Sequence, residues 1–356
     1  MIVVIGAGVA GLEAALALAR HGIESLLVER SARAGGRAAT YSCKALEEEC
    51  QACGACLAGQ KLAEVLECPL VRLRLHTEVQ SAERAEGGFR VRLRQGDSQE
   101  EVLAQGVIVT VGFTPVFPAR RGEFGYGHLA GVITALEAEA ILQDTPEAFA
   151  PGAQVAFVQC AGSRDPAAGI PYCSRACCLY VPKLARLLAA VSGAQADVYF
   201  MDRQSYPPVY RDGNQGLRYL RGMPSRVFPL ADGRLEIRCA GPGGDQPRPR
   251  AYDWVVLCPA MTPAAGGAEL GRWLGLGTDA RGFLLPRADS GAPAMAAGAC
   301  TGPVTILESV ASARAAAAEM ACRLAPGSPS RPHRASSPRH SGPDPQFRLD
   351  AGPGEC

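Results

Sequence analysis

The feature that most constrains this chain of 356 residues lies at its N-terminus, where an apolar run is followed at once by a glycine-rich turn. The run at 2–5 is β-branched, the turn opens a helix-period stretch, and a second apolar run then ends in an acid. This order is the fingerprint of a dinucleotide-binding βαβ unit, in which glycines let the backbone approach a pyrophosphate and the acid binds a ribose hydroxyl. The residues of the pattern are Gly6, Gly8, Gly11 and Glu29.

Composition excludes several other classes of protein. Lys plus Arg number 36 and Asp plus Glu number 35, so no overall field attracts a nucleic acid or an acidic membrane. No apolar run approaches the roughly 18 residues of a membrane span. Because the first strand begins at once and leaves no room for a signal peptide, we expect a cytoplasmic protein without a membrane span or a nucleic-acid partner.

Three further segments resemble parts of flavoproteins with two dinucleotide-binding domains. The glycines and arginine at 35–37 match the loop along the adenosine side of FAD, and 106–115 matches the strand and turn where the chain leaves the flavin domain. The segment 296–303 precedes a long helix, 304–322, whose start faces the flavin in such proteins. Ala299 replaces the usual Asp, which leaves the contact to the ribityl phosphate open. The residues assigned to FAD in these segments are Gly36, Arg37, Gly112, Gly298, Ala299 and Gly302.

These segments predict an α/β fold of the thioredoxin reductase-like type, a Rossmann-type FAD domain with an inserted second α/β domain. The first strand of the insert, 153–159, is followed by Cys160 instead of a glycine turn, so we expect no NAD(P)H binding there. The expected divisions are 1–115 for the first part of the FAD domain with a cysteine-rich insert at 40–70, 116–254 for the inserted module, 255–323 for the second part, and 324–356 for a disordered tail.

Four cysteines stand where the second glycine turn is missing. Four thiolates are the ligands of a [4Fe-4S] cluster, and adjacent cysteines can serve one cluster where the backbone is irregular. Pro182 predicts that the regular helix begins there and leaves 173–178 as a loop. Buried thiols and a zinc site are the alternatives. The four are Cys160, Cys173, Cys177 and Cys178.

The phrases VQCAGSRD, PYCSRACCLYVPK and GACTGP resemble the A subunit of heterodisulfide reductase and its compact relatives in sulfur metabolism, over residues 1–322. The resemblance implies FAD, a [4Fe-4S] cluster on the four cysteines, and transfer of electrons to heterodisulfide reductase-like B and C subunits or other electron-transfer proteins, in a homodimer. It also implies that Lys183 lies near the flavin, which assigns it a catalytic role. The alternatives are a free-standing flavin-dependent disulfide or pyridine-nucleotide oxidoreductase and a zinc-stabilised interaction subunit.

A second cysteine run follows the flavin glycines. Its C-x2-C-x2-C core is shared with bacterial ferredoxins and indicates a second iron–sulfur site, with zinc as the alternative. Cys43 or Cys68 completes the set: Cys68 precedes a proline, as ferredoxin ligands often do, whereas Cys43 lies closer to the core and is favoured. The core residues are Cys50, Cys53 and Cys56.

Three other cysteines receive a structural interpretation. Cys239 and Cys258 lie on strand patterns and are interpreted as small buried hydrophobic residues, and Cys300 approaches the flavin only because its loop does.

Overall fold

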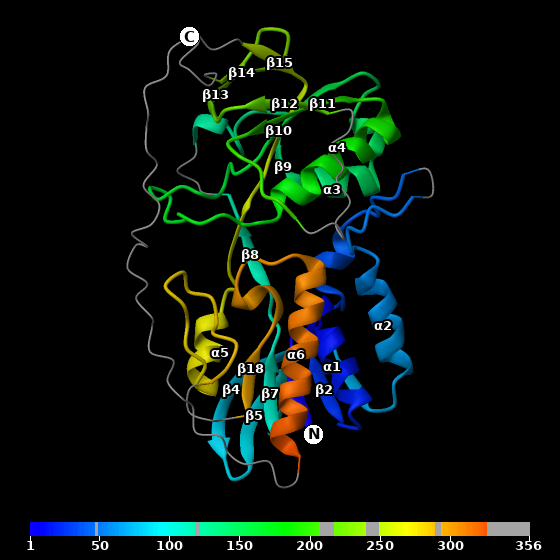
Figure 1. The fold of residues 1–356 in the computed structure, drawn as a ribbon, viewed down its shortest axis with the longest axis vertical. Coiled ribbons are helices and arrows are strands. Elements are labelled where there is room, and N and C mark those ends of the chain that lie inside the picture. The colour runs from blue at the N-terminus through cyan, green and yellow to red at the C-terminus, as the bar shows by residue number, and fades with distance from the viewer. Residues whose placement is uncertain (47–48, 118–121, 207–216, 240–248, 289–292, 326–356) are drawn as a thin grey trace, which may run out of the picture.

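The computed structural model describes residues 1–46, 49–117, 122–206, 217–239, 249–288 and 293–325. Two lobes are stacked along the long axis, and each contains a five-stranded sheet (Figure 1). The predicted disordered tail lies outside the described residues from 326 onward, while Leu324 still belongs to the last helix.

The first lobe contains the N-terminal pattern. Its sheet is parallel throughout, and three helices cover one face with an apolar core between helices and sheet. The strands in spatial order are β18 (Ala294–Ala296), β7 (Gly106–Val109), β1 (Ile2–Ile5), β2 (Ser25–Val28) and β3 (Val71–Arg74). The helices are α1 (Val9–Arg20), α2 (Leu57–Glu67) and α6 (Ile306–Leu324).

A buried carboxylate connects these three helices. Glu13 of α1 is fully buried and pairs with Lys61 of α2 and Arg314 of α6. Because removing one partner of a buried ion pair leaves an uncompensated charge, this arrangement fixes α2 against α1. The position of α2 matters because the helix begins directly after Cys56.

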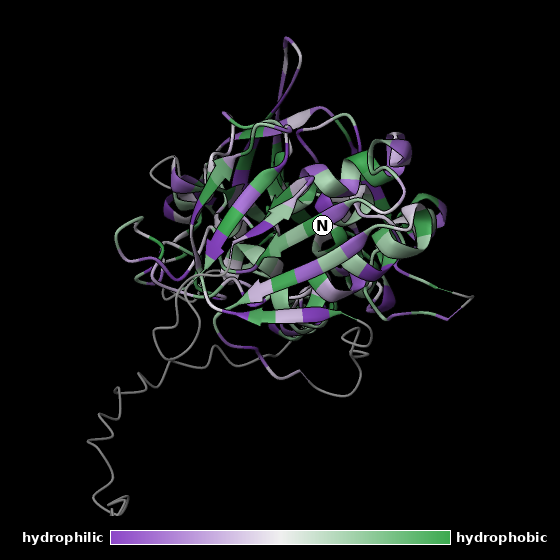
Figure 2. Ribbon diagram, turned by 90° about the horizontal axis from the view of Figure 1, so that it is seen from above, coloured by the Kyte–Doolittle hydropathy of each residue, from purple (hydrophilic) through white to green (hydrophobic). Residues whose placement is uncertain are grey.

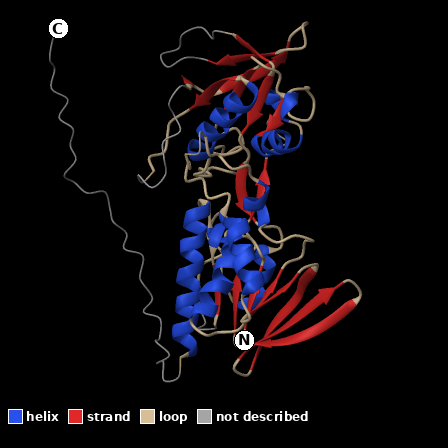
Figure 3. Cartoon of the chain, turned by 90° about the vertical axis from the view of Figure 1, so that its right-hand side faces the viewer, coloured by secondary structure: helices blue, strands red, loops and turns tan. Residues whose placement is uncertain are grey.

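The other face of the first sheet is covered by an antiparallel sheet and one helix, which share a second apolar core with it. Figure 3 shows this antiparallel sheet projecting away from the helices. Its strands are β4 (Thr77–Ala85), β5 (Gly88–Gln95) and β6 (Ser98–Ala104), and the helix is α5 (Gly267–Leu274).

The second lobe repeats the plan with a second parallel sheet. Two helices cover one face and a three-stranded antiparallel sheet covers the other, with an apolar core on each side. In Figure 2 the strands carry both green and purple residues, so hydrophobic and polar side chains are mixed along them. The parallel strands in order are β12 (Arg218–Arg221), β11 (Gln195–Phe200), β10 (Gln154–Val158), β16 (Trp254–Leu257) and β9 (Val132–Thr134). The covering elements are α3 (Ala135–Asp144), α4 (Cys177–Ser192), β13 (Pro224–Pro229), β14 (Leu235–Cys239) and β15 (Arg250–Tyr252).

The lobes are joined by an antiparallel pair of strands, which lies between them in Figure 1. Since β16 pairs with β10 and β9, the chain leaves the second sheet after residue 257, slightly later than the expected division at 254. The joining strands are β8 (Phe113–Val116) and β17 (Ala260–Pro263). Short 3-10 helices are η1 (Gly36–Thr40), η2 (Gly122–Phe124), η3 (Pro146–Ala148) and η4 (Gly298–Thr301).

The predicted start of α4 is wrong. The helix begins at Cys177, and Pro182 lies inside it. The preference of proline for a first turn is local, and here the bonds that start the helix form before it, with the Tyr180 amide donating to the Ala176 carbonyl at 3.1 Å. Cys177 and Cys178 are therefore helical, and Lys183 lies in the second turn.

Candidate functional site

One cavity of about 660 Å³ lies where the carboxyl ends of both parallel sheets meet. Glu29 and Thr110 line it from the ends of β2 and β7, and Cys160 and Cys258 line it from the ends of β10 and β16. Ligands of open α/β sheets bind at the carboxyl ends of the strands, so this cavity is the candidate site.

The predicted dinucleotide turn forms one wall of the cavity. Gly6 has φ +99°, and a Cβ there would lie 2.8 Å from the Thr110 carbonyl oxygen, so the turn requires glycine. Gly8 is the N-cap of α1, where no side chain caps the helix, and it lines the cavity. The first amides of α1 are thus available to an anion such as a pyrophosphate.

Glu29 lies beside this turn. One carboxylate oxygen accepts from the Ala7 amide at 2.9 Å, and the other accepts from the amide and hydroxyl of Ser31 at 2.9 and 2.8 Å. These bonds hold the carboxylate at the cavity wall, where a ribose hydroxyl would be recognised.

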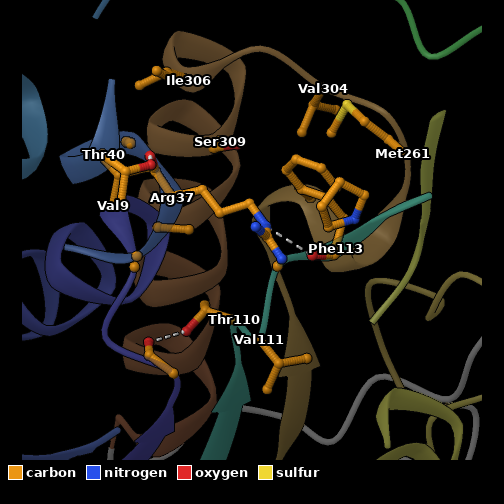
Figure 4. A pocket seen from close by; sticks show the side chains of 18 of the residues that line it. Val9, Arg37, Thr40, Thr110, Val111, Phe113, Met261, Val304, Ile306 and Ser309 are labelled. Carbon is orange, nitrogen blue, oxygen red and sulfur yellow. Dashed lines mark hydrogen bonds between the residues drawn. The ribbon is translucent and has the colours of Figure 1, made fainter. Parts of the chain in front are cut away.

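Arg37 extends across the cavity wall toward Phe113 (Figure 4). Its Nε donates to the Phe113 carbonyl at 3.3 Å, and its guanidinium carbon lies 5.4 Å from the centre of the Phe113 ring. This contact joins the segment after β2 to the start of β8. Gly36, Gly112 and Ala299 also line the cavity.

Three of the residues assigned to FAD are not in the cavity lining: Gly11, Gly298 and Gly302. Gly298, at φ +74°, packs instead against α1, where a Cβ would lie 2.7 Å from the Cβ of Ala10. It is therefore a close-packing position between η4 and α1, behind the site.

Cysteines of the first cysteine run, by which we mean Cys160, Cys173, Cys177 and Cys178, lie at the other end of the cavity. Cys160 follows β10 with φ +60°, and Cys177 and Cys178 begin α4. The hydrogen bond with the Cys177 thiol lowers the pKa of Cys160, and a second such bond lowers the pKa of Cys178 to about 6. Cys173 is half-buried, and its sulfur accepts from the Arg175 amide at 3.2 Å. Thiols with lowered pKa values are metal ligands and nucleophiles at neutral pH.

Cys258 belongs to the same group of thiols, which the sequence interpretation did not anticipate. It is buried as expected, but its thiol interacts with that of Cys177 and it lines the cavity. The available signal was that Cys160 and Cys258 each follow an apolar strand. Only the pairing of β10 with β16 shows that the two strands end at the same edge.

The second cysteine run approaches the cavity from the first lobe. Burial raises the pKa of the Cys56 thiol, and Cys53, Cys43 and Cys50 raise it further because thiolates so close together repel one another. Cys53 lines the cavity. Cys68 instead lies at the C-cap of α2, the opposite end from Cys56, about 18 Å away at 1.5 Å per residue. The structure therefore brings Cys43, and not Cys68, to the core of the run.

Neither run forms a closed ligand set. Among the described residues, no three His, Cys, Asp or Glu side chains are arranged as a ready metal-binding group. The thiols of each run are neighbours, so binding of one metal group requires their side chains to turn toward a common point. Within the same described part of the chain, no helix is long and apolar enough to span a membrane.

Lys183 lies inside the molecule, between the two cysteine runs. Only 2% of the residue is exposed, it lines the cavity, and its Nζ donates to the Gln51 carbonyl at 2.5 Å. The alternative of a solvated surface lysine is therefore wrong.

In the second lobe, the turn after β10 carries an ion pair instead of a glycine turn. Arg164, with φ +62°, donates from both terminal nitrogens to Asp202 at 2.5 and 2.9 Å. Asp202 follows the next strand, β11, where an acid would bind the ribose of a dinucleotide. Its carboxylate is already occupied by a guanidinium.

Comparison with known proteins agrees with this geometry. Residues 4–64 match the family model of the NAD(P)-binding Rossmann-like domain. The chain is 26% identical to the second iron-sulfur A subunit of CoB–CoM heterodisulfide reductase of Methanopyrus kandleri, over 91% of this chain and 64% of that protein. It is 30% identical to the A subunit of H2:CoB–CoM heterodisulfide,ferredoxin reductase of Methanothermobacter marburgensis, over 65% of this chain and 39% of the relative. The chain thus spans less than two thirds of either relative's length, and the resemblance predicted from its motifs is confirmed.

Solved structures confirm the predicted fold. Thioredoxin reductase of T. acidophilum superposes with a TM-score of 0.61 at 18% identity, over 91% of this chain and 96% of that one. An NAD-dependent persulfide reductase from A. fulgidus gives a TM-score of 0.58 at 19% identity, over 90% of this chain and 58% of that one. The chain therefore has the fold with two dinucleotide-binding domains that the glycine patterns predicted.

Proposed function

We propose that this chain, a relative of the A subunit of heterodisulfide reductase, is an FAD- and [4Fe-4S]-dependent oxidoreductase subunit that passes electrons between flavin, clusters and partner proteins. One observation carries the proposal: a single cavity has the dinucleotide turn at one end and cysteines of both runs at the other. Electron transfer requires cofactors close together, and the cavity supplies that proximity.

The residues around the first sheet fit FAD. The open amides at the start of α1 suit its pyrophosphate, and the fixed carboxylate of Glu29 suits its adenosine ribose. Arg37 and Phe113 close the wall beyond them. When bound, FAD would supply the exchange between two-electron and one-electron chemistry. The chain's own contribution is to orient it and to limit the access of water.

The donor set of each cysteine run fits a [4Fe-4S] cluster. Cys160, Cys173, Cys177 and Cys178 supply four thiols at the second lobe, and Cys43, Cys50, Cys53 and Cys56 supply four at the first. The lowered pKa values of Cys160 and Cys178 favour the thiolates that iron requires, whereas the pKa values of Cys173 and Cys177 are raised, so binding of iron would release protons from these two thiols. Reduced thiols of this kind persist in the cytoplasm, which is where we place the protein.

The proposal also includes partners. Heterodisulfide reductase-like B and C subunits, or other electron-transfer proteins, would hold the disulfide chemistry, and the chain would act as a homodimer. The alternative is a free-standing flavin-dependent disulfide or pyridine-nucleotide oxidoreductase. That alternative needs a nucleotide site in the second lobe, where Arg164 already pairs with Asp202.

Anaerobic purification followed by counts of flavin, iron and sulfide tests the proposal. We expect one FAD and two clusters, about eight irons per chain, with about four left after either Cys53→Ser or Cys160→Ser. If the parent contains about four irons and Cys53→Ser leaves this number unchanged, the second cluster is absent and only the first cluster of the proposal is retained. A colourless protein that contains zinc would overturn the proposal in favour of a zinc-stabilised interaction subunit.

A further inference from the structure

The segment with the second cysteine run is anchored on the second lobe, although the sequence places it in the first. Figure 1 shows the blue chain between α1 and α2 extending toward α3 and α4. The Lys183 ammonium of α4 bonds the Gln51 carbonyl, and the Gln143 side chain of α3 donates to the Thr40 carbonyl at 2.8 Å. The segment is therefore held at two points, Thr40 and Gln51, by helices α3 and α4 of the second lobe.

The strongest anchor is Glu139 of α3. One of its carboxylate oxygens accepts from the Ser42 amide at 3.1 Å, and the other pairs with the Lys44 ammonium at 2.5 Å. Glu139 is 5% exposed and Lys44 is 3% exposed. A buried pair of this kind contributes little net stability, but loss of one partner leaves a buried charge uncompensated, so the pair strongly specifies where the segment lies.

The choice of lysine at this position supports a specific role. The sequence contains only three lysines, Lys44, Lys61 and Lys183, against a much larger number of arginines. All three are buried. An ammonium is a compact charge at the end of a flexible stem, so these lysines serve internal contacts, whereas the exposed cations of the described residues are arginines.

Cys43 lies between the two residues that Glu139 holds. Its own side chain is exposed, so packing does not fix it, and its position depends on the bonds to Ser42 and Lys44. Cys56 is held from the opposite side, because α2 follows it directly and Lys61 fixes α2 to Glu13. Gln51, beside Cys50, is bonded to Lys183. Cys43 lies outside this core, and the contacts that fix its two neighbours come from Glu139 of α3.

We propose that Glu139 is a positioning residue that holds Cys43 as the fourth ligand of an iron–sulfur site with Cys50, Cys53 and Cys56. The inference rests on the second cluster of the proposed function and goes beyond it. It assigns a role to a residue of the second lobe, and it makes the site dependent on contact between the lobes.

The test is release of iron to a chelator from the anaerobically purified full chain, followed with the electron paramagnetic resonance spectrum of the reduced protein. Glu139→Gln keeps the size of the side chain and an oxygen for the Ser42 amide but removes the charge that Lys44 needs. We expect about half of the iron to be released at least about ten-fold faster than in the parent, as when a residue supporting a metal ligand is lost. The other half should be released at the parental rate.

Glu137→Gln is the matched control. It makes the same chemical change on the same helix, where Glu137 caps α3 through Thr134 and pairs with Tyr126, away from the cysteine segment. We expect reduced thermal stability and a parental rate of iron release. A fast phase in this control equal to that of Glu139→Gln would attribute the effect to general destabilisation and overturn the proposal.

A double variant, Lys44→Met with Glu139→Gln, allows for poor folding of the single variant. It leaves no buried charge, so FAD and the first cluster should be retained while half of the iron is still released fast. Parental release from both Glu139 variants, with eight irons in the parent, would overturn the positioning role and leave the proposed function intact. Four irons in the parent, unchanged by Cys53→Ser, would overturn both the second cluster and this role.

Discussion

Arg175 and Glu308 form an ion pair between the first cysteine run and α6, the last helix of the first lobe, with 3.0 Å between Nη2 and Oε1. The other terminal nitrogen of Arg175 donates to the Pro303 carbonyl at 3.2 Å. Glu308 also completes the capping box that starts α6. The turn that carries Cys173 is thereby attached directly to the segment that faces the cavity at the start of α6.

Replacement of this arginine should affect the cysteines more than the fold. Arg175→Met removes a pair in which the side chains are 48% and 38% exposed, so we expect the free energy of unfolding to change by less than about 1 kcal/mol. Iron bound at the first run should nevertheless be released to a chelator faster, because the turn loses the two contacts that the Arg175 side chain makes with Glu308 and Pro303. Arg234→Met, which removes an exposed pair with Asp232, is the control. Denaturant unfolding measures the change in the free energy of unfolding, and chelation kinetics measure the rate of iron release. Equal rates of iron release from Arg175→Met and Arg234→Met would contradict this prediction.

Glu29 should determine affinity for the flavin. Glu29→Ala leaves the Ala7 amide and the Ser31 hydroxyl without their shared acceptor and removes the carboxylate expected at the ribose. Loss of such bonds costs about 1 to 3 kcal/mol, which corresponds to roughly a 5- to 150-fold weaker Kd for FAD. Titration of the apoprotein with FAD, followed by flavin fluorescence, measures this Kd. Glu24→Ala, at an exposed position before the same strand, should bind FAD like the parent, and a parental Kd for Glu29→Ala would remove Glu29 from the site.

The isolated protein should not be reduced by NADH or NADPH. The second lobe lacks a glycine turn after β10, and the acid after β11 is bonded to Arg164. Dithionite or a reduced partner protein should bleach the flavin, whereas stoichiometric NADH should leave its absorbance unchanged under anaerobic conditions. Rapid bleaching by NADH would contradict this and favour the free-standing reductase.

The parts of the fold that follow from local pattern were predictable. The run at 2–5 forms β1, and Glu29 lies at the end of β2 beside the glycine turn. Both were predictable because the backbone conformation of a βαβ unit is determined by residues that are close together in the sequence. The start of α4 was not predictable from Pro182, since a proline preference is weak against the contacts that place Cys177 in the core.

The parts of the site that depend on strand order and on contacts between the lobes could not be predicted from the sequence. Cys258 joins the thiols of the first run only because β16 lies next to β10. The choice between Cys43 and Cys68 depends on α2, which separates Cys68 from Cys56 by its full length. Nothing in the local pattern around Cys43 indicates Glu139, which is nearly a hundred residues away in the sequence and lies on helix α3 of the second lobe.

Lys183 is the residue through which the chain should set the flavin potential. The burial of its ammonium in the cavity wall places a cation in surroundings of low polarity, where it stabilises a nearby anion more than it would in water. A bound flavin becomes more negative on reduction, so an interaction of about 1.4 kcal/mol with the reduced form would raise its two-electron potential by about 30 mV.

The informative variant is Lys183→Gln, because an amide can still donate to the Gln51 carbonyl while the charge is lost. We expect FAD and iron contents like those of the parent and a lower flavin potential in an anaerobic redox titration. Lys183→Met removes the donor as well, so it should show the same lower potential together with faster release of iron from the second run, whose segment it no longer holds. If the titration of Lys183→Gln overlays that of the parent, the ammonium does not act on the flavin, and the role of Lys183 reduces to holding the segment at Gln51.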